Sequence, residues 1–343
     1  MQVGLVTGRS RVDLQEFPDP VPEPGKAVVQ IAYCGICGTD VHAYQSGAPY
    51  NPAICGHEWC GTVVAPGNSV DLREGDRVAI GIAGACGRCA TCRRGDPEHC
   101  ETAFAGLIGQ GPLAAPHGGF ASSIAIDAAR LYRLHDAIDD VQGALLEPAT
   151  IALHAVRRTP IRLGDCVVVI GAGPIGLLLA QCARAAGAGA LVVVEPQPGR
   201  RELAGRLGAD LLVNPSDEEA GERIAAFTGR VGADVVFECA GIPATIDTAV
   251  TLSRRGGAVS LVGVPTAPAS IDAATWLVKE IRLTSSLGYL REEFDLTQAL
   301  VQDQRLNLAP LHSATVGLAG LAGAFESLAS TPEDIKILVD PNA

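Results

Sequence analysis

The chain has 343 residues, of which 48% are hydrophobic and 19% charged, and its formal net charge is −12. A chain of this size and composition folds into more than one domain and is not intrinsically disordered. The negative charge disfavours nucleic acid or an anionic membrane surface as a partner. No apolar run is long enough for a transmembrane helix and the N-terminus lacks the layout of a signal peptide, so we expect a cytoplasmic protein.

The first part of the chain, up to about residue 150, consists of short β-like runs separated by glycine and proline. Two such runs are 27–33 and 61–65, and an irregular, proline-rich stretch covers 17–25. Short apolar runs bounded by turn-forming residues are typical of strands. The sequence therefore predicts a β-rich domain in this part of the chain.

Potential metal ligands stand in two segments of this part, YCGICGTDVH and CGHEWCG. The first contains Cys37, and the second contains His57 and Glu58. A further acid, Glu147, follows near the end of the region. A thiolate, an imidazole and a carboxylate, together with an open position, are the coordination of a catalytic zinc ion. The segments therefore predict a catalytic zinc site.

Four cysteines lie close together in a polar segment with the spacing C-x2-C-x2-C-x7-C: Cys86, Cys89, Cys92 and Cys100. In a cytoplasmic protein they are unlike a disulfide framework, because thiols there stay reduced. Four thiolates can close tetrahedrally around Zn²⁺ and leave no position for a substrate, which is typical of a structural site. An iron–sulfur cluster uses similar spacing and is the alternative on these residues alone.

The second part of the chain alternates apolar strands with Ala/Leu/Arg-rich helices, which indicates βαβ units and an α/β fold with a doubly wound parallel sheet. The predicted strands are 166–170, 190–195, 210–213, 234–239, 257–263 and 281–286. The predicted helices are 174–186, 199–207, 217–228 and 243–254. After about residue 290 the pattern is mixed again and ends in a helix near 317–329 and a strand over 335–340.

A glycine motif joins the first of these strands to its helix. Its residues are Gly171, Gly173 and Gly176, with Pro174 and Ile175 between them. Such glycines allow a tight turn and bring backbone N–H groups close to a pyrophosphate at the helix N-terminus. The strand before, the helix after and an acid at the end of the next strand make the motif specific for a dinucleotide.

The acid at the end of the next strand is Glu195, nineteen residues beyond Gly176. Its carboxylate can accept hydrogen bonds from a ribose and would repel a 2′-phosphate, so the sequence favours NAD over NADP. Arg200 follows five residues later and can contact the same end of the cofactor. At the ends of the later strands we expect contacts with the nicotinamide from Cys239, Val262, Val264, Ser286 and Leu287.

The segments GICGTDVH, GHE, EPATIALHAV and VVVIGAGPIG, together with the four-cysteine lobe, resemble the zinc-dependent medium-chain dehydrogenase/reductase family. The resemblance covers the whole chain. It implies a GroES-like, β-rich catalytic domain over 1–152 with a structural zinc lobe at 86–100, a Rossmann NAD-binding domain over 153–287, and a return to the catalytic domain over 288–343. It also implies two Zn²⁺ per chain instead of an iron–sulfur cluster, NAD as cofactor, and a homodimer or homotetramer.

The resemblance also assigns roles to the candidate metal ligands. It implies that Cys37 and His57 bind the catalytic zinc, with Glu58 or Glu147 as the further ligand. The classical alcohol dehydrogenases carry a cysteine in the place of Glu147. The glutamate therefore indicates the branch that is similar to polyol and threonine dehydrogenases.

Three further residues of the GICGTDVH segment receive roles from the same resemblance. Thr39 matches the hydroxyl that takes the substrate proton, and His42 matches the group that passes the proton on to solvent. Asp40 matches the carboxylate that orients the zinc-binding imidazole.

The function implied is a zinc-dependent NAD(H) oxidoreductase that interconverts a secondary alcohol and its ketone by hydride transfer. The substrate is a small molecule: a polyol, an amino-cyclitol or a related hydroxy compound. Sorbitol-like polyol dehydrogenases carry an arginine before a tyrosine where this chain has Gly288 and Tyr289. The arginine that would bind the hydroxyl groups of a simple hexitol is therefore missing. The loop 103–117, in which Gln110 and His117 are the large polar side chains, suits a less polar alcohol or an amino-cyclitol.

Two other classes of protein remain open. One is a zinc-independent quinone or enone reductase of the same superfamily, which the ligands Cys37, His57 and Glu58 argue against. The other is a non-enzymatic zinc-lobe binding protein with a vestigial nucleotide fold. The charge of −12 argues against a nucleic-acid-binding version of it.

Overall fold

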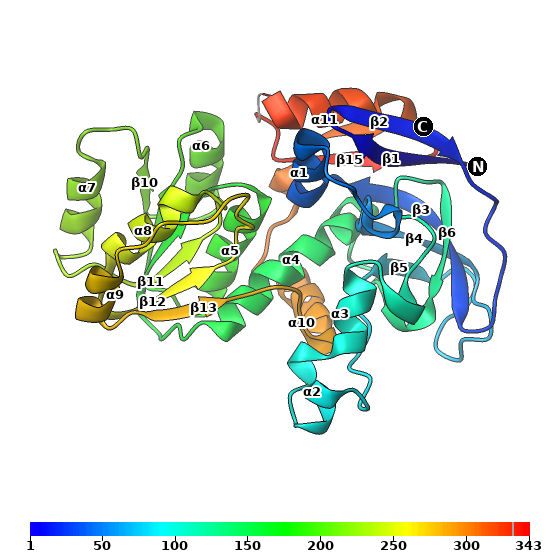
Figure 1. Cartoon of the computed structure of the whole chain (residues 1–343), viewed down its shortest axis with the longest axis horizontal. Helices are drawn as coiled ribbons and strands as arrows, with labels where there is room; N and C mark the ends of the chain where they lie inside the picture. Colours follow the sequence, from blue (N-terminus) through cyan, green and yellow to red (C-terminus); the bar gives the residue numbers. More distant parts are fainter. Residues whose placement is uncertain (331–332) are drawn as a thin grey trace. The chain divides into compact units, whose positions relative to one another are not determined.

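The computed structural model describes residues 1–330 and 333–343, and it divides the chain into two compact units (Figure 1). Unit 1 consists of Met1–Glu147, Gly288–Gln302 and Leu311–Ala343, and unit 2 of Pro148–Leu287 and Asp303–Pro310. The division after Glu147 lies five residues before the boundary expected from the sequence. Helix α4 (Asp140–Arg158) contains this division. The short return of 303–310 to unit 2 was not expected.

Unit 1 is built on a seven-stranded sheet of order β14-β15-β3-β4-β5-β7, with β6 paired to β3, and on the hairpin β1-β2. The strands are β1 (Gln2–Gly8), β2 (Arg11–Glu16), β3 (Lys26–Gly35), β4 (Glu58–Ala65), β5 (Arg77–Ile80), β6 (Ser123–Asp127), β7 (Leu131–Arg133), β14 (His312–Gly317) and β15 (Lys336–Asp340). The helices are α1 (Gly38–Ser46), α2 (Ala90–Arg93), α3 (Glu101–Leu107), α10 (Arg291–Gln302) and α11 (Leu321–Ser330).

Strand β3 is central in unit 1, because β15 and β4 both pair with its C-terminal end. Gly35 is opposite Glu58 on one side and opposite Leu338 on the other. The apolar side chains of these strands pack with Phe120 and Phe325, which are fully buried. The first residues after β3 and the first residue of β4 are thereby fixed near each other, and these residues include the candidate metal ligands.

Unit 2 contains a six-stranded, all-parallel sheet of order β10-β9-β8-β11-β12-β13 (green to orange in Figure 1). Its strands are β8 (Cys166–Ile170), β9 (Ala190–Val194), β10 (Leu211–Val213), β11 (Ala233–Glu238), β12 (Ser253–Leu261) and β13 (Arg282–Ser285). The helices that follow its strands are α5 (Pro174–Ala185), α6 (Pro198–Arg206), α7 (Ala220–Phe227), α8 (Pro243–Leu252) and α9 (Ala273–Lys279). The continuous Val-rich runs of β8 and β9 are buried, as both faces of a parallel sheet require. The predicted α/β fold class, with a β-rich part and a doubly wound parallel sheet, is confirmed.

The predicted helix 243–254 ends two residues early, at Leu252. Ser253 begins β12 and pairs with Ala233, so this strand also starts earlier than the predicted 257. Gly256, with φ +68°, lies in the irregular stretch where the register between β11 and β12 shifts. Such a bulge interrupts the apolar pattern that sequence reasoning relies on. Among the residues described, no helix combines the length and apolar character needed to cross a bilayer.

Candidate functional site

The side chains of Cys37, His57 and Glu58 meet in unit 1, with donor atoms that all lie within 4.8 Å of one another. Cys37 precedes α1 as its N-cap, and His57 and Glu58 stand where the chain enters β4. A thiolate, an imidazole nitrogen and a carboxylate oxygen at this spacing fit a Zn²⁺ ion with three protein ligands. The donor set therefore matches the predicted catalytic metal.

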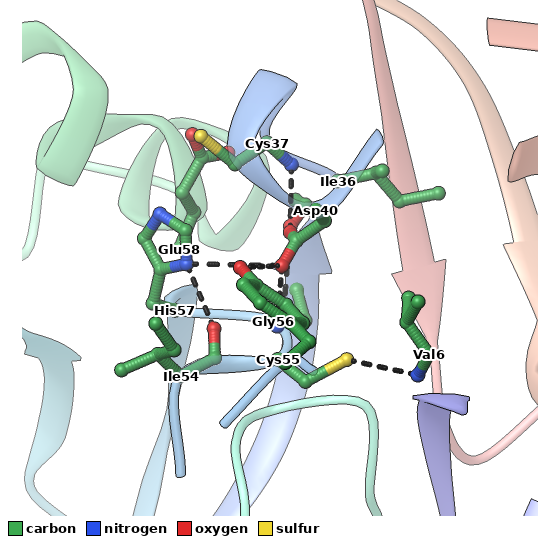
Figure 2. Close-up of polar contacts among 12 residues, drawn as sticks. Val6, Ile36, Cys37, Asp40, Ile54, Cys55, Gly56, His57 and Glu58 are labelled. Carbon is green, nitrogen blue, oxygen red and sulfur yellow. Dashed lines mark hydrogen bonds and ion pairs between the residues drawn. The ribbon is translucent and has the colours of Figure 1, made fainter. Parts of the chain in front are cut away.

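Asp40 connects the two segments that carry these ligands (Figure 2). Its Oδ2 accepts a hydrogen bond from the amide of Cys37 at 3.0 Å, and its Oδ1 accepts one from the amide of Gly56 at 3.2 Å. The phenol of Tyr50 donates to Oδ1 at 2.6 Å. Burial raises the pKa of the fully buried Asp40, and His57, Tyr50 and the two amides act in the opposite direction. The carboxylate thus fixes the separation of the two ligand segments.

The imidazole of His57 is oriented by a backbone carbonyl. Its Nδ1 lies 2.9 Å from the oxygen of Ile54, whereas Oδ1 of Asp40 is 4.0 Å away. Nδ1 therefore carries the proton and donates to Ile54, which leaves Nε2 for a metal. We expected Asp40 to make this contact, but its oxygens are taken by the amides and by Tyr50.

Glu58 makes an ion pair that the sequence analysis missed. Its Oε2 accepts from Nζ of Lys336 at 2.5 Å, and the side chains are 1% and 2% exposed. A lysine in the apolar run IKILVD was the available signal, because lysine is almost never fully buried unless it is paired. Tyr50, which donates to Asp40, follows the Gly- and Pro-containing segment SGAP. Nothing in that segment indicates a buried hydrogen-bonding residue, so the sequence could not have predicted this contact.

Glu147 lies outside the group of three donor atoms. It is 6% exposed, and it interacts electrostatically with His57, Glu58, Lys336 and Arg130. Burial raises the pKa of Glu147 to about 7, and the repulsion from Glu58 acts in the same direction. Glu58 is therefore the carboxylate that the described geometry brings to the metal-binding donors.

Thr39 and His42, both on α1, are the residues expected to move the substrate proton. The hydroxyl of Thr39 is buried and has no hydrogen-bond partner in the described part of the chain. His42 is half-buried, and burial lowers its pKa, so the ring is neutral at pH 7. An orphaned hydroxyl beside Cys37 fits a group whose partner is the substrate.

The second donor group consists of the four cysteines Cys86, Cys89, Cys92 and Cys100, whose sulfurs also lie within 4.8 Å of one another. Hydrogen bonds, of which the largest come from Thr102 and Thr91, lower the pKa values of Cys86 and Cys89. Burial and the proximity of Cys89 raise the pKa of Cys92. None of the eleven cysteines forms a disulfide bond in the structure.

Four sulfurs at this spacing fit a closed zinc site. Amides already point at them: the N–H of Cys86 donates to Sγ of Cys100 at 3.2 Å, and the N–H of Cys89 to Sγ of Cys86 at 3.3 Å. Such bonds stabilise thiolates, which are the metal-binding form. His99 is not in the group, because its Nδ1 lies 2.8 Å from both oxygens of Asp96.

In unit 2 the glycine motif forms the turn between β8 and α5. Gly171 has φ +94°, and a Cβ on Gly176 would overlap the carbonyl oxygen of Gly171. A Cβ on Gly173 would come no nearer than 4.0 Å to an atom of another residue, Nη1 of Arg200. The positive φ thus favours glycine at the first position, and close packing requires it at the last. The middle glycine leaves open space at the helix N-terminus, which fits a pyrophosphate. Pro174 begins the helix, and Ile175 follows it.

Glu195 directly follows β9 and is 5% exposed. Its Oε2 accepts from the amide of Ala172 in the glycine turn at 2.6 Å, and its Oε1 accepts from the amide of Gln197 at 2.9 Å. A carboxylate can accept about four hydrogen bonds, so two remain for ribose hydroxyls. The position agrees with the predicted role.

The residues expected at the nicotinamide follow the C-terminal ends of β11, β12 and β13. Backbone bonds order this edge: Cys239 N–H donates to Ile170 O at 2.8 Å, and Ser286 N–H to Leu261 O at 3.1 Å. The hydroxyl of Ser286 is buried and has no hydrogen-bond partner among the described residues, whereas Val264 and Leu287 are 49% and 66% exposed. Val262, the remaining residue of this set, donates its N–H to Glu238 O at 2.9 Å.

A buried cation, Arg130, was also missed. It is 5% exposed; its Nε donates to Gly81 O at 3.2 Å and its Nη1 to Leu113 O at 3.3 Å. It interacts electrostatically with Glu147 and Tyr289, and within residues 1–330 and 333–343 the buried hydroxyl of Tyr289 has no hydrogen-bond partner. Burial lowers the pKa of Arg130, which nevertheless remains charged because guanidinium pKa values are so high.

Comparisons with known proteins agree with this geometry. Residues 23–136 match the alcohol dehydrogenase GroES-like domain, and residues 174–303 match the zinc-binding dehydrogenase family. The chain is 34% identical to 2-dehydro-3-deoxy-L-galactonate 5-dehydrogenase of Pseudoalteromonas atlantica, over 94% of this chain and 93% of that protein. It is 32% identical to (R,R)-butanediol dehydrogenase of Bacillus subtilis, over 96% and 97% of the two chains.

Among solved structures, a zinc-binding dehydrogenase from Sinorhizobium meliloti 1021 bound to NADP superposes with a TM-score of 0.84. The superposition covers 99% of each chain at 29% identity. Relatives of this kind therefore bind a nicotinamide dinucleotide in the same fold.

The four-cysteine lobe predicts a metal count. Elemental analysis of the purified protein should give about two zinc ions per chain, and Cys92→Ser should lose one of them, because serine cannot replace the thiolate. The melting temperature of this variant should fall by roughly 5 °C or more. His99→Ala is the matched control and should keep both ions. Unchanged zinc content in Cys92→Ser would contradict the lobe assignment.

The raised pKa of Glu147 predicts a pH dependence in protein depleted of metal by a chelator. Between the unfolded value of 4.5 and the folded value of about 7, the folded state holds a proton that the unfolded chain releases. The free energy of unfolding should therefore fall as pH rises through this window, by at most about 3 kcal/mol.

Urea unfolding at pH 5 and pH 8 measures this difference. Glu147→Gln cannot ionise and should lose less stability than the unaltered chain between the two pH values. Equal losses in the two proteins would mean that Glu147 is not held in its neutral form.

Proposed function

The chain belongs to the zinc-binding medium-chain alcohol dehydrogenases, and we propose that it oxidises a secondary alcohol of a polyhydroxylated substrate to a ketone with NAD as the hydride acceptor. The observation that carries this proposal is the convergence of Cys37, His57 and Glu58 within 4.8 Å. Three ligands of these types hold a zinc ion and leave a position for the substrate oxygen.

A zinc ion bound by these residues supplies Lewis acidity, which lowers the pKa of a hydroxyl group by several units. Cys37, His57 and Glu58 would hold the ion, with the tautomer of His57 set by Ile54. The orphaned hydroxyl of Thr39 would accept the substrate proton and pass it toward the neutral ring of His42. NAD held at the glycine turn would supply the hydride acceptor, so that the substrate loses a hydride and a proton and its C–O bond becomes C=O.

The preference for NAD rests on Glu195. Its buried carboxylate lies at the ribose end of the glycine turn, where a 2′-phosphate would meet a like charge. A solved relative binds NADP in the same fold, so the fold alone does not select the cofactor, and we assign that choice to the side chain at the ribose end. Arg200, whose Nη1 approaches Gly173, would contact the phosphates or the adenosine.

Two observations bear on the substrate. The names of the relatives include a diol dehydrogenase and a dehydrogenase of a sugar acid. In addition, the buried cation Arg130 and the orphaned hydroxyl of Tyr289 interact electrostatically with Glu147. The name of the first relative makes a sugar acid the second candidate beside neutral polyols and amino-cyclitols, and the positive charge of Arg130 near Glu147 is consistent with a substrate carboxylate.

The decisive test is Cys37→Ser. The substitution should abolish NAD-linked oxidation of polyols, diols, sugar acids and amino-cyclitols while leaving the melting temperature close to that of the unaltered chain. NADH formation followed at 340 nm across this panel measures the activity and identifies the substrate class. Cys166→Ser, which lies outside both donor groups, is the control and should retain activity. Full activity of Cys37→Ser would favour the zinc-independent reductase.

Cofactor preference gives a second test. Glu195→Gln removes the charge but keeps one accepting oxygen, so the KM for NADP should fall roughly tenfold while the kcat with NAD changes little, equivalent to about 1.4 kcal/mol. Exposed Glu202 on α6 provides the matched control, Glu202→Gln. If the ratio of kcat/KM for the two cofactors were the same in all three proteins, Glu195 would have no role in discrimination.

A further inference from the structure

Lys336 is the first residue of β15, and the neighbouring residues Ile335, Ile337, Leu338 and Val339 are buried and apolar. Its ammonium group is 2% exposed and makes two contacts, with Oε2 of Glu58 at 2.5 Å and with the carbonyl oxygen of Ile36 at 2.9 Å. The strand that carries the lysine is separated from β4, which carries the glutamate, by β3.

Gly35, at the end of β3, provides the space for this pair. A Cβ at this position would clash with Oε2 of Glu58 and would lie 3.4 Å from Cδ of Lys336. Its backbone does not have a positive φ, so the conformation itself does not demand glycine. The glycine is therefore required by the approach of the lysine and the glutamate across the central strand.

The ion pair leaves the two oxygens of Glu58 unequal. Oε2 is held by Lys336, whereas Oε1 makes no hydrogen bond to any residue in the described ranges. Burying two charges is expensive, and a well-packed apolar pair is often as stable, so stability alone gives no reason for the pair. Its position against a candidate metal ligand suggests a different role.

We propose that Lys336 is a positioning residue for the metal site, which restricts Glu58 to a single oxygen toward the ion and balances the negative charge of the donor group. The ammonium competes with the ion for Oε2. It also lies close enough to interact electrostatically with Cys37 and Asp40. Lys336 therefore weakens metal binding and keeps the coordination number low, which preserves a position for the substrate. This inference rests on the proposed function only through the assignment of Cys37, His57 and Glu58 as ligands.

Lys336→Met tests the inference, because methionine fills a similar volume without charge. The apparent dissociation constant for zinc, measured by competition with a chelator, should fall at least tenfold. The reason is that Oε2 and an uncompensated negative charge are then available to the ion. After replacement of zinc by Co²⁺, the visible d–d absorption of the variant should weaken, because the coordination number rises. A second metal ion is expected in the four-cysteine lobe. The Cys37→Ser protein keeps that lobe, so the metal ion that this variant loses is the one bound by Cys37, His57 and Glu58.

Three further variants separate this role from a structural one. Lys336→Arg retains the positive charge, so its apparent dissociation constant for zinc should stay within a few-fold of that of the unaltered protein. In a Glu58→Ala background, Lys336→Met should change retention much less than it does when Glu58 is present, because only the weaker interaction of the lysine with Cys37 and Asp40 is then lost. Lys279→Met is the control for loss of a hydrogen-bonded lysine: the half-buried Lys279 donates from its Nζ to the carbonyl oxygens of Val250, Thr251 and Ser253, and to no carboxylate among the residues described.

The outcomes distinguish the two proposals. Unchanged or weaker zinc retention with an unchanged Co²⁺ spectrum in Lys336→Met, even with a lower melting temperature, would overturn the positioning role and leave the proposed function intact. An unaltered protein with no metal at Cys37 would overturn both. If Lys336→Met does not accumulate, Lys336→Gln removes the same charge and is expected to shift retention in the same direction.

Discussion

The buried carboxylate of Asp40 holds together the two chain segments on which the site depends. It accepts hydrogen bonds from the amide that precedes α1 and from the amide of Gly56, and Tyr50 donates a third. The side chain of Asp40 is completely buried, so each of these bonds replaces water that the charge has lost. The pairing of β3 with β4 brings the two segments together, and Asp40 links the backbone at Cys37 to the backbone beside His57.

Charge balance is the second requirement of the site. Asp40, Glu58 and the thiolate form of Cys37 concentrate negative charge in a region with little solvent, and burial there raises the pKa of Glu147 to about 7. Burial opposes a charge on His57, but Cys37, Asp40 and Glu147 together outweigh it and raise the pKa of the ring. A divalent metal ion and the ammonium of Lys336 would both offset this negative charge. The need for charge balance explains why the acidic side chains and the buried lysine occur in the same site.

The features that the sequence predicted correctly are local in the chain. The cysteine spacing, the glycine turn with its flanking strand and helix, and the apolar strands of unit 2 each lie within a short stretch. The missed contacts are distant in the chain: Lys336 is 278 residues from Glu58, and the pair forms only because β15, β3 and β4 align in one register. The carbonyl of Ile54 that orients His57 could not be read from side-chain patterns at all. The roles given to Thr39, His42 and the nicotinamide contacts remain predictions.

The central claim is that Cys37, His57 and Glu58 hold one zinc ion that the four-cysteine lobe does not hold. Anomalous diffraction at the zinc absorption edge, from crystals of the protein as purified, tests it directly. The account predicts two anomalous peaks per chain, one of them at about 2.0–2.3 Å from Sγ of Cys37, Nε2 of His57 and one oxygen of Glu58. A single peak at the cysteine lobe, with these three side chains bound to no ion, would contradict it.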